Sequence, residues 1–273
     1  MSKKSTPYLG KRGISSFFLH KSHIELWKTC KRAAFNSIMH IDRSTPDGVI
    51  TEAGTSFHLA CNRFFDNVDL NRIVSMDASA RLKYFKDILE TLPENRELLY
   101  RFAQFENDRF EAFKNNPVRW FPCNRELEII KPKIGLWGTI DSVEYVYDDP
   151  DSEERAVVEY KTGRLTDWRK TKLRRELAVY KLLIDDTPMA PVPIKHIGAF
   201  CAGNEDYRDG IMFEKVNGQT LTALLKVIKE IRETFEKAYI GDRKYDLSYF
   251  PKEASAFCML CSYSERCYEE ESI

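Results

Sequence analysis

The chain of 273 residues has no excess of either charge, since its 42 basic residues are balanced by 42 acidic ones. It therefore lacks the global positive field of many nucleic-acid-binding proteins, and any contact with nucleic acid must be local. No stretch approaches the ~20 consecutive apolar residues of a membrane-spanning helix, so we expect no membrane contact. The polar, basic N-terminus (1–12) is followed by no apolar signal region, and we expect an intracellular, most simply cytoplasmic, protein.

The sequence also lacks internal repeats and low-complexity linkers. Its apolar content of 43% and aromatic content of 12% suffice for a full hydrophobic core and are not typical of disorder. A chain of this length forms one large domain or two small ones. We expect a single domain over 1–273, built from a helical region (1–120), a core (121–215) and a C-terminal helix with a cysteine run (216–273).

Hydrophobic periodicity predicts helices in the first third of the chain and strands in the middle. The expected helices are 22–38 with Ser22 as N-cap, 51–67 after a turn-rich stretch at 42–48, further helix within 76–115 broken by Pro93, 167–185 and 218–239. The expected strands are 125–131, 134–147, 154–161, 194–202 and 209–215. This order predicts an α/β fold in which helices flank a mixed central sheet.

Seven cysteines without a secretory signal fit a reducing compartment better than a disulfide framework. Cys61, Cys123 and Cys201 are isolated, and we interpret them as small buried hydrophobic residues. The other four are Cys30 and the C-x2-C-x5-C run of Cys258, Cys261 and Cys267. Four thiols can hold a tetrahedral zinc ion or an iron–sulfur cluster, and the cysteines alone do not decide between them.

A second group of candidate residues occupies the predicted hairpin. Side chains alternate along a strand, so Glu159 and Lys161 project from the same face of 154–161. Asp141, in Gly-Thr-Ile-Asp (138–141), lies on the preceding strand. Two carboxylates can bind Mg²⁺ or Mn²⁺, and a nearby ammonium can stabilise negative charge on a phosphate or orient the attacking water. From spacing alone, a hairpin with a surface Glu–Lys pair is an equally good interpretation.

A local basic stretch runs from Lys161 to Lys181. It holds eight basic residues against two acidic ones, with Trp168 and Tyr180 between them. Such a stretch suits phosphate contacts and base stacking. By itself it also fits a solvated helix face.

Gly-Thr-Ile-Asp followed by Val-Glu-Tyr-Lys-Thr-Gly (158–163) resembles the PD-(D/E)xK nuclease core in its RecB-like form. The resemblance implies a restriction-endonuclease-like core in which Asp141 and Glu159 bind the metal and Lys161 is catalytic. Similar proteins carry a metal-binding histidine on an earlier helix, which implicates His58 in Gly-Thr-Ser-Phe-His. A partly buried helix histidine beside Phe57 is the alternative interpretation.

The same family carries Gln-x-x-x-Tyr on the helix after the lysine strand. Tyr180 matches this motif, but Glu176 replaces the glutamine. Residues four apart share a helix face, so Glu176 and Tyr180 are both expected to face the catalytic cleft. The basic stretch beside this motif becomes a candidate DNA-binding track, with Arg164, Trp168, Arg169 and Lys172 as substrate-binding residues.

The cysteine pattern resembles that of RecB-like nucleases with a 4Fe–4S cluster, such as CRISPR-associated RecB-type exonucleases and the AddB nuclease domain. Ser-x-Ile-x-x-Trp-x-x-Cys-x-Arg (22–32) is similar to their N-terminal motif. The resemblance implies that Cys30, Cys258, Cys261 and Cys267 bind the cluster, with zinc as the alternative. Because hydrolysis needs no electron transfer, we expect a structural clasp that closes a long loop.

These features predict a metal-dependent nuclease that acts on single-stranded DNA or on single-stranded ends or flaps. One alternative is a DNA-processing subunit of a larger CRISPR-adaptation or recombination and repair assembly, with weak activity alone. Another is an inactive DNA-binding scaffold. The chain has no helicase motif, so any unwinding must come from partner proteins.

Overall fold

The computed structural model describes residues 17–40, 49–90, 96–190, 192–242 and 244–269. The turn expected at 42–48 and the helix break expected at Pro93 lie outside these ranges. The chain divides into two compact units. The first comprises Met1–Gly48, Ile130–Gly138 and Gly218–Ile273, and the second comprises Val49–Ile129 and Thr139–Asn217. The single nuclease domain expected over 1–273 stays a prediction.

Apart from the helix expected over 22–38, the predicted helices and strands are present in the predicted order with shifted ends. The short helices Leu70–Val74 and Ser264–Glu269 and the small strands Tyr239–Gly241 and Lys244–Tyr245 were not predicted. The α-helices are α1 (Lys21–Thr29), α2 (Lys31–Ile38), α3 (Val49–Asn67), α4 (Leu70–Val74), α5 (Ala78–Glu90), α6 (Arg96–Ala112), α7 (Asp167–Ile184), α8 (Gly218–Ala238) and α9 (Ser264–Glu269). The strands are β1 (Asn124–Lys131), β2 (Leu136–Tyr145), β3 (Arg155–Lys161), β4 (His196–Cys201), β5 (Ile211–Lys215), β6 (Tyr239–Gly241) and β7 (Lys244–Tyr245). Short 3₁₀ helices are η2 (Pro117–Trp120), η3 (Tyr207–Gly210), η4 (Leu247–Tyr249) and η5 (Ala256–Leu260).

The main sheet has five strands in the order β1-β2-β3-β4-β5. β3 pairs antiparallel with β2 and parallel with β4, and β4 pairs antiparallel with β5. The parallel pair requires a crossover connection, which α7 supplies by packing against both β3 and β4. The predicted mixed sheet flanked by helices is therefore confirmed.

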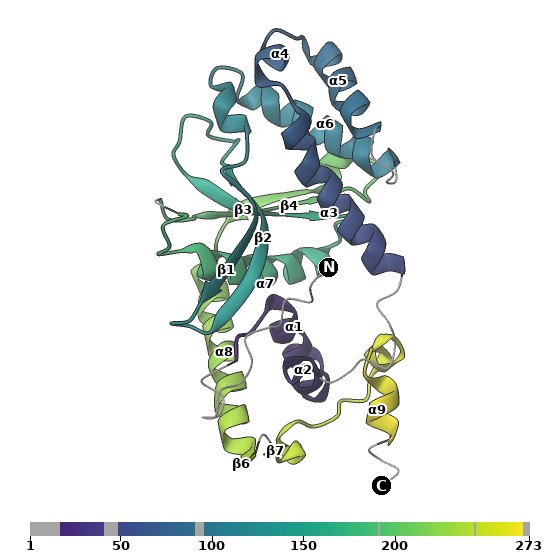
Figure 1. Cartoon of the computed structure of the whole chain (residues 1–273), viewed down its shortest axis with the longest axis vertical. Coiled ribbons are helices and arrows are strands. Elements are labelled where there is room, and N and C mark those ends of the chain that lie inside the picture. The colour runs from purple at the N-terminus through teal and green to yellow at the C-terminus, as the bar shows by residue number, and fades with distance from the viewer. Residues whose placement is uncertain (1–16, 41–48, 91–95, 191, 243, 270–273) are drawn as a thin grey trace. The chain divides into compact units, whose positions relative to one another are not determined.

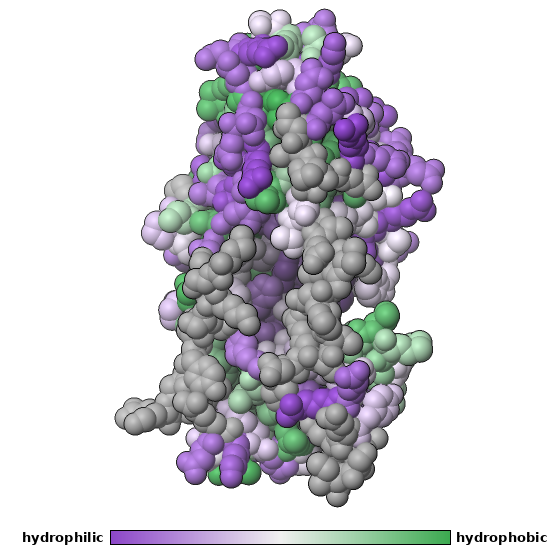
Figure 2. Space-filling model, turned by 45° about the vertical axis from the view of Figure 1, so that its right-hand side comes forward, coloured by the Kyte–Doolittle hydropathy of each residue, from purple (hydrophilic) through white to green (hydrophobic). Residues whose placement is uncertain are grey.

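Within the second unit, helices cover both faces of the central strands (Figure 1). α3, α5 and α6 build an aromatic core with η2, and the β3 side chains Ala156, Val158 and Tyr160 belong to that core. α7 packs on the other face, toward which Val157 and Glu159 alternate. The top of Figure 2, where the helices of this unit lie, is covered largely by hydrophilic side chains. Strand β3, which carries Glu159 and Lys161, thus lies between two helical layers.

The helix expected over 22–38 is two helices, because Cys30 interrupts it. Cys30 is extended, at φ −158° and ψ 115°, and lies between the end of α1 and the start of α2. The predicted N-cap was also wrong: His20 caps α1, and its side chain accepts the backbone N–H of Ser22. The break turns Cys30 away from the regular helical path, and its thiol packs with Ala33 and Tyr263.

The first unit has its own aromatic core. The rings of Phe35, Phe235 and Phe250 lie between 4.5 and 5.6 Å apart, measured between their centroids. The buried guanidinium of Arg32 donates to the carbonyl oxygens of Phe250 and Leu247, at 3.0 Å each. These contacts join α2 to the segment that leads into the C-terminal cysteines.

Among the described residues, no helix combines the length and the apolar character needed to cross a membrane.

Candidate active site

Asp141 lies where the pairing of β2 with β3 ends. The register between these antiparallel strands ends at the pair Ser142↔Val158, and Asp141 immediately precedes Ser142 in the sequence. Beyond that pair, the Asp141 carboxylate replaces a backbone acceptor: its Oδ2 accepts the Tyr160 N–H at 3.0 Å. A charge-assisted bond of this kind fixes the carboxylate at the point where the two strands separate.

His58 approaches Asp141 from α3. Its Nδ1 lies 2.9 Å from Asp141 Oδ2, and both side chains are largely buried. Burial opposes protonation of the imidazole, but the hydrogen bond and the charge of Asp141 outweigh it and raise the pKa of His58. The structure therefore brings together two residues that are more than eighty positions apart in the sequence.

Glu126, on β1, is a candidate ligand that the sequence analysis missed. One ligand atom from each of His58, Glu126 and Asp141 lies within 4.8 Å of the others. Burial, followed by the charge of Asp141, raises the pKa of Glu126. Its backbone has φ 46°, a left-handed conformation that is uncommon for glutamate. Side-chain alternation along β1 places Glu126 and Glu128 on the same face, so the sequence alone does not single out Glu126 as the candidate ligand.

Glu159 and Lys161 project from β3 as the alternation predicts. Glu159 is 1% exposed, and the ammonium of Lys161 donates to its Oε1. Burial opposes the charge on Lys161, but the carboxylates of Glu159 and Glu176 outweigh burial and raise the pKa of Lys161. Lys161 therefore stays protonated at neutral pH.

α7 places Glu176 and Tyr180 against the same pair. Burial, the charge of Glu159 and a hydrogen bond to Glu159 raise the pKa of Tyr180. Glu176 is 8% exposed and pairs with Lys172 at 3.6 Å. Both helix residues thus face the strand that carries Lys161, as their spacing of four predicts.

The basic stretch is more neutral in the structure than in the sequence. Four of its bases have carboxylate partners outside the predicted site, at 2.6 to 3.8 Å: Arg164 with Glu205, Lys170 with Asp167, Arg174 with Glu214 and Lys181 with Asp185. Pairing of this kind removes much of the local positive field on which the predicted DNA track depends.

Trp168 and Arg169 keep the character expected of a substrate contact. The Trp168 ring is 72% exposed, and the Lys172 ammonium lies 5.8 Å from its centroid. Arg169 lies against the loop after β3: a Cβ built on Gly163 would fall 1.8 Å from a guanidinium nitrogen. The absence of a side chain at Gly163 is what lets the guanidinium approach the backbone.

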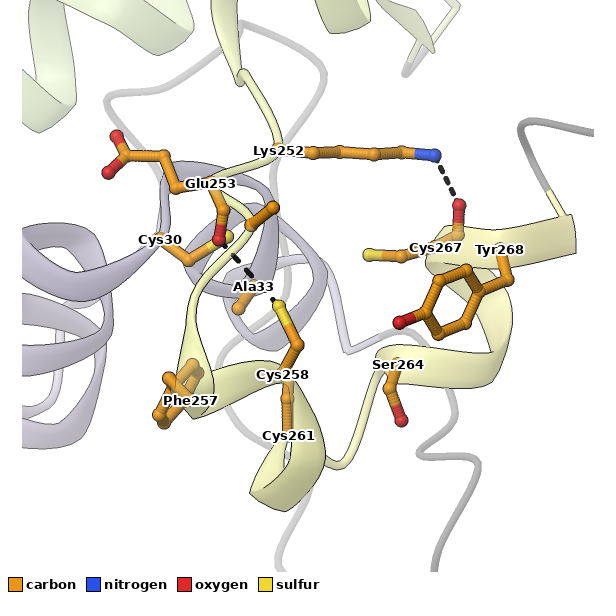
Figure 3. A pocket seen from close by; sticks show the side chains of 11 residues that line it. Cys30, Ala33, Lys252, Glu253, Phe257, Cys258, Cys261, Ser264, Cys267 and Tyr268 are labelled. Carbon is orange, nitrogen blue, oxygen red and sulfur yellow. Dashed lines mark hydrogen bonds between the residues drawn. The ribbon is translucent and has the colours of Figure 1, made fainter.

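The four cysteines singled out in the sequence line one pocket of the first unit, with a volume of about 220 Å³. Figure 3 shows the sulfurs of Cys30, Cys258 and Cys267 turned toward the same central space. Burial raises the pKa of the Cys261 thiol, and the neighbouring thiols of Cys30 and Cys258 add to the rise. Of the remaining cysteines, Cys61 and Cys201 are buried as expected and Cys123 is partly buried.

Comparison with known proteins agrees with this geometry. The family model described as the PD-(D/E)XK nuclease superfamily matches residues 21–268. No curated protein matches the chain. The family match spans both the strands with Asp141, Glu159 and Lys161 and the four cysteines. Because it covers far more than half of the chain, the chain belongs to the PD-(D/E)XK nuclease superfamily.

Proposed function

We propose that this protein is a metal-dependent deoxyribonuclease that hydrolyses phosphodiester bonds in single-stranded DNA or at single-stranded ends and flaps. The observation that carries the proposal is the convergence of His58, Glu126 and Asp141 within 4.8 Å beside the Glu159–Lys161 pair. Nucleases of this superfamily use divalent metals such as Mg²⁺ or Mn²⁺.

The donor set fits such an ion. Carboxylate oxygens are the preferred ligands of Mg²⁺ and Mn²⁺, and one imidazole is compatible with Mn²⁺. Asp141, Glu126, Glu159 and His58 would hold the metal, which would polarise the phosphate and activate water. The hydrogen bond that Asp141 accepts from the Tyr160 N–H fixes its orientation, as contacts behind metal ligands generally do.

Lys161 supplies positive charge to the reaction. Lys161 is suited to stabilising negative charge that develops on the phosphate, because its ammonium lies beside Glu159 at the proposed metal site. Tyr180 contributes through its hydrogen bond with Glu159, which holds that carboxylate in place. Glu176 is a second carboxylate acting on Lys161, in addition to Glu159.

The test is cleavage of labelled DNA with Mg²⁺ or Mn²⁺. Single-stranded, duplex and flap substrates carry a label at either end, and wild type is compared with Asp141→Asn and Lys161→Met. We expect both variants to lose at least about 100-fold in rate, the scale on which one charge-stabilising group contributes. Lys195→Met is the matched control, because Lys195 forms an exposed pair with Glu154 at 2.5 Å. Equal cleavage by Lys161→Met and wild type would refute the site.

The second candidate function is a DNA-processing subunit of a larger assembly, such as one for CRISPR adaptation or for recombination and repair. The observation that favours it is the pairing of Arg164, Arg174 and Lys181 with carboxylates, which weakens DNA affinity of the chain alone. In that case, wild type cuts slowly and a partner protein restores the rate. DNA binding without any cleavage at several pH values indicates a scaffold instead.

We also propose that Cys30, Cys258, Cys261 and Cys267 bind a 4Fe–4S cluster, in keeping with RecB-like relatives of this superfamily. Thiolates are the ligands that such clusters require. The four cysteines line one pocket of about 220 Å³, which leaves room for a group larger than a single ion. The cluster would have a structural role, because it would join Cys30, at the start of α2, to Cys267 in α9. Hydrolysis transfers no electrons, so the reaction does not need the cluster for electron transfer.

Anaerobic purification tests the cluster. We expect brown protein with iron and acid-labile sulfide, and loss of both in Cys258→Ser. Cys123→Ser is the matched control, because Cys123 is not among the described residues that line the pocket. A colourless protein without iron but with zinc would show that the site is a zinc site.

A further inference from the structure

The four-cysteine pocket contains one basic side chain. Of the described residues that line it, only Lys252 carries a positive charge. Figure 3 shows its chain extending across the pocket toward Cys267, while the Glu253 carboxylate turns away from the sulfurs. The pocket therefore combines four thiols with one lysine whose ammonium ends at the backbone of Cys267.

Lys252 makes a specific contact with the segment that supplies the last cysteine. Its Nζ donates to the backbone oxygen of Cys267, in α9. The next residue also contacts the site, since the Cys258 sulfur lies 3.7 Å from the backbone oxygen of Glu253. The two-residue segment 252–253 thus touches both cysteine-bearing elements of the C-terminal run.

The charge of the site calls for a cation. Four thiolates bring four negative charges, and either a zinc ion or an oxidised iron–sulfur core compensates only two of them. The pocket is partly shielded from water, because Cys30 is 7% exposed and the other three cysteines are half-buried. Excess charge in such surroundings is unfavourable unless an opposite charge lies nearby.

We propose that Lys252 is a positioning residue of the four-cysteine metal site: its ammonium holds Cys267 in place and offsets the negative charge of the thiolates. The proposal rests on the metal-binding role proposed above for the four cysteines. It predicts that Lys252 affects both the retention of the metal and, for an iron–sulfur cluster, its reduction potential. Net charge near a cluster is one of the determinants of that potential.

The experiment compares wild type with Lys252→Met, Lys252→Arg and Lys237→Met after anaerobic purification. Lys237 is an exposed lysine of α8 in the same unit and serves as the matched control. Iron and sulfide per chain, the rate of metal loss to a chelator and the reduction potential are measured for each. We expect Lys252→Met to lose metal about 10-fold faster, the lower end for loss of a supporting contact, and to have a lower potential. Lys252→Arg is expected to restore both.

Several results would overturn the proposal. One is Lys252→Met protein with the metal retention and potential of Lys237→Met. Another is Lys252→Met protein that loses metal faster but has an unchanged reduction potential, which would show that Lys252 only holds α9 in place and does not offset the charge of the thiolates. If wild type contains zinc and no iron, the cluster is rejected but Lys252 is still tested by the rate of zinc loss. If wild type binds neither metal, the metal site and the role of Lys252 are both rejected.

Discussion

Replacing Arg169 by Gln tests which base of α7 contacts DNA. Four of the bases in the stretch have carboxylate partners outside the predicted site, whereas the structure records no ion pair for Arg169 among its described residues. Its guanidinium lies over Gly163, in the loop that follows Lys161. In open α/β sheets, ligands bind at the carboxyl ends of parallel strands, which is where β3 and β4 lead into their loops. We therefore expect Arg169 to contact a phosphate.

The magnitude follows from counterion release. Each phosphate contact adds about 0.7 to the slope of log affinity against log salt for single strands. Arg169→Gln is expected to lower that slope by about this amount, so the ratio between variant and wild-type affinities changes about 2.6-fold between 50 and 200 mM salt. Fluorescence anisotropy of a labelled single strand, with EDTA present to prevent cleavage, measures both slopes.

Arg174→Gln is the matched control. Its Nε and Nη2 atoms lie 2.6 and 2.9 Å from the two Glu214 carboxylate oxygens, so its charge is already compensated. We expect an unchanged salt slope in this variant. Gly163→Ala gives a second test, because the added methyl group collides with the flexible end of Arg169 and should displace it. A slope change in Arg174→Gln equal to that in Arg169→Gln would refute the reasoning.

Three further predictions concern Tyr160 on β3, Glu106 on α6 and Glu126 on β1. Tyr160→Phe removes a buried hydrogen bond of 2.6 Å to Glu144 and should lower the free energy of unfolding by about 1.5–3 kcal/mol in urea titrations. Burial raises the pKa of Glu106 to about 7, so the folded state binds the proton more tightly than the unfolded chain does and stability falls as pH rises from about 4.5 to about 7. Glu106→Gln should flatten that fall, and an undiminished fall would exclude Glu106 as its source. Glu126→Gln should raise the Mn²⁺ concentration for half-maximal cleavage about 10-fold, whereas Glu128→Gln should leave it unchanged.

Short-range patterns in the sequence predicted the parts of the site that lie on one element. The period of two along 155–161 placed Glu159 and Lys161 on one face of β3. The spacing of four placed Glu176 and Tyr180 on one face of α7. The convergence of His58 with Asp141 came from resemblance to a family, because no local pattern joins α3 to β2. Their contact at 2.9 Å agrees with that expectation.

Other features could not be predicted, since they depend on distant partners or on unusual backbone. The helix break at Cys30 has no glycine or proline to mark it, as the sequence there is Trp-Lys-Thr-Cys-Lys-Arg (27–32). Glu126 reaches the site through a backbone conformation that glutamate rarely adopts. Arg164 and Arg174 of the basic stretch pair with Glu205 and Glu214, each about forty residues further along the chain. Charge counted along the sequence therefore overstated the field that DNA would meet.

Tyr160 links the proposed site to a buried ionic group on the other face of β3. Its backbone N–H holds Asp141, while its hydroxyl donates to Glu144 in the direction of α6. Glu144 lies 3.4 Å from the Arg109 guanidinium, which also pairs with Glu106 at 2.9 Å.

Buried charges of this kind contribute little net stability compared with apolar residues of the same size, so stability alone does not explain them. Their geometric effect is specific: β3 cannot slide along β2 without breaking the hydrogen bond that the Tyr160 hydroxyl donates to Glu144 on β2. A slip by one residue would also turn Glu159 away from Asp141, because the side-chain period of a strand is two. The aromatic residue between Glu159 and Lys161 thus fixes the register on which the convergence of the carboxylates depends.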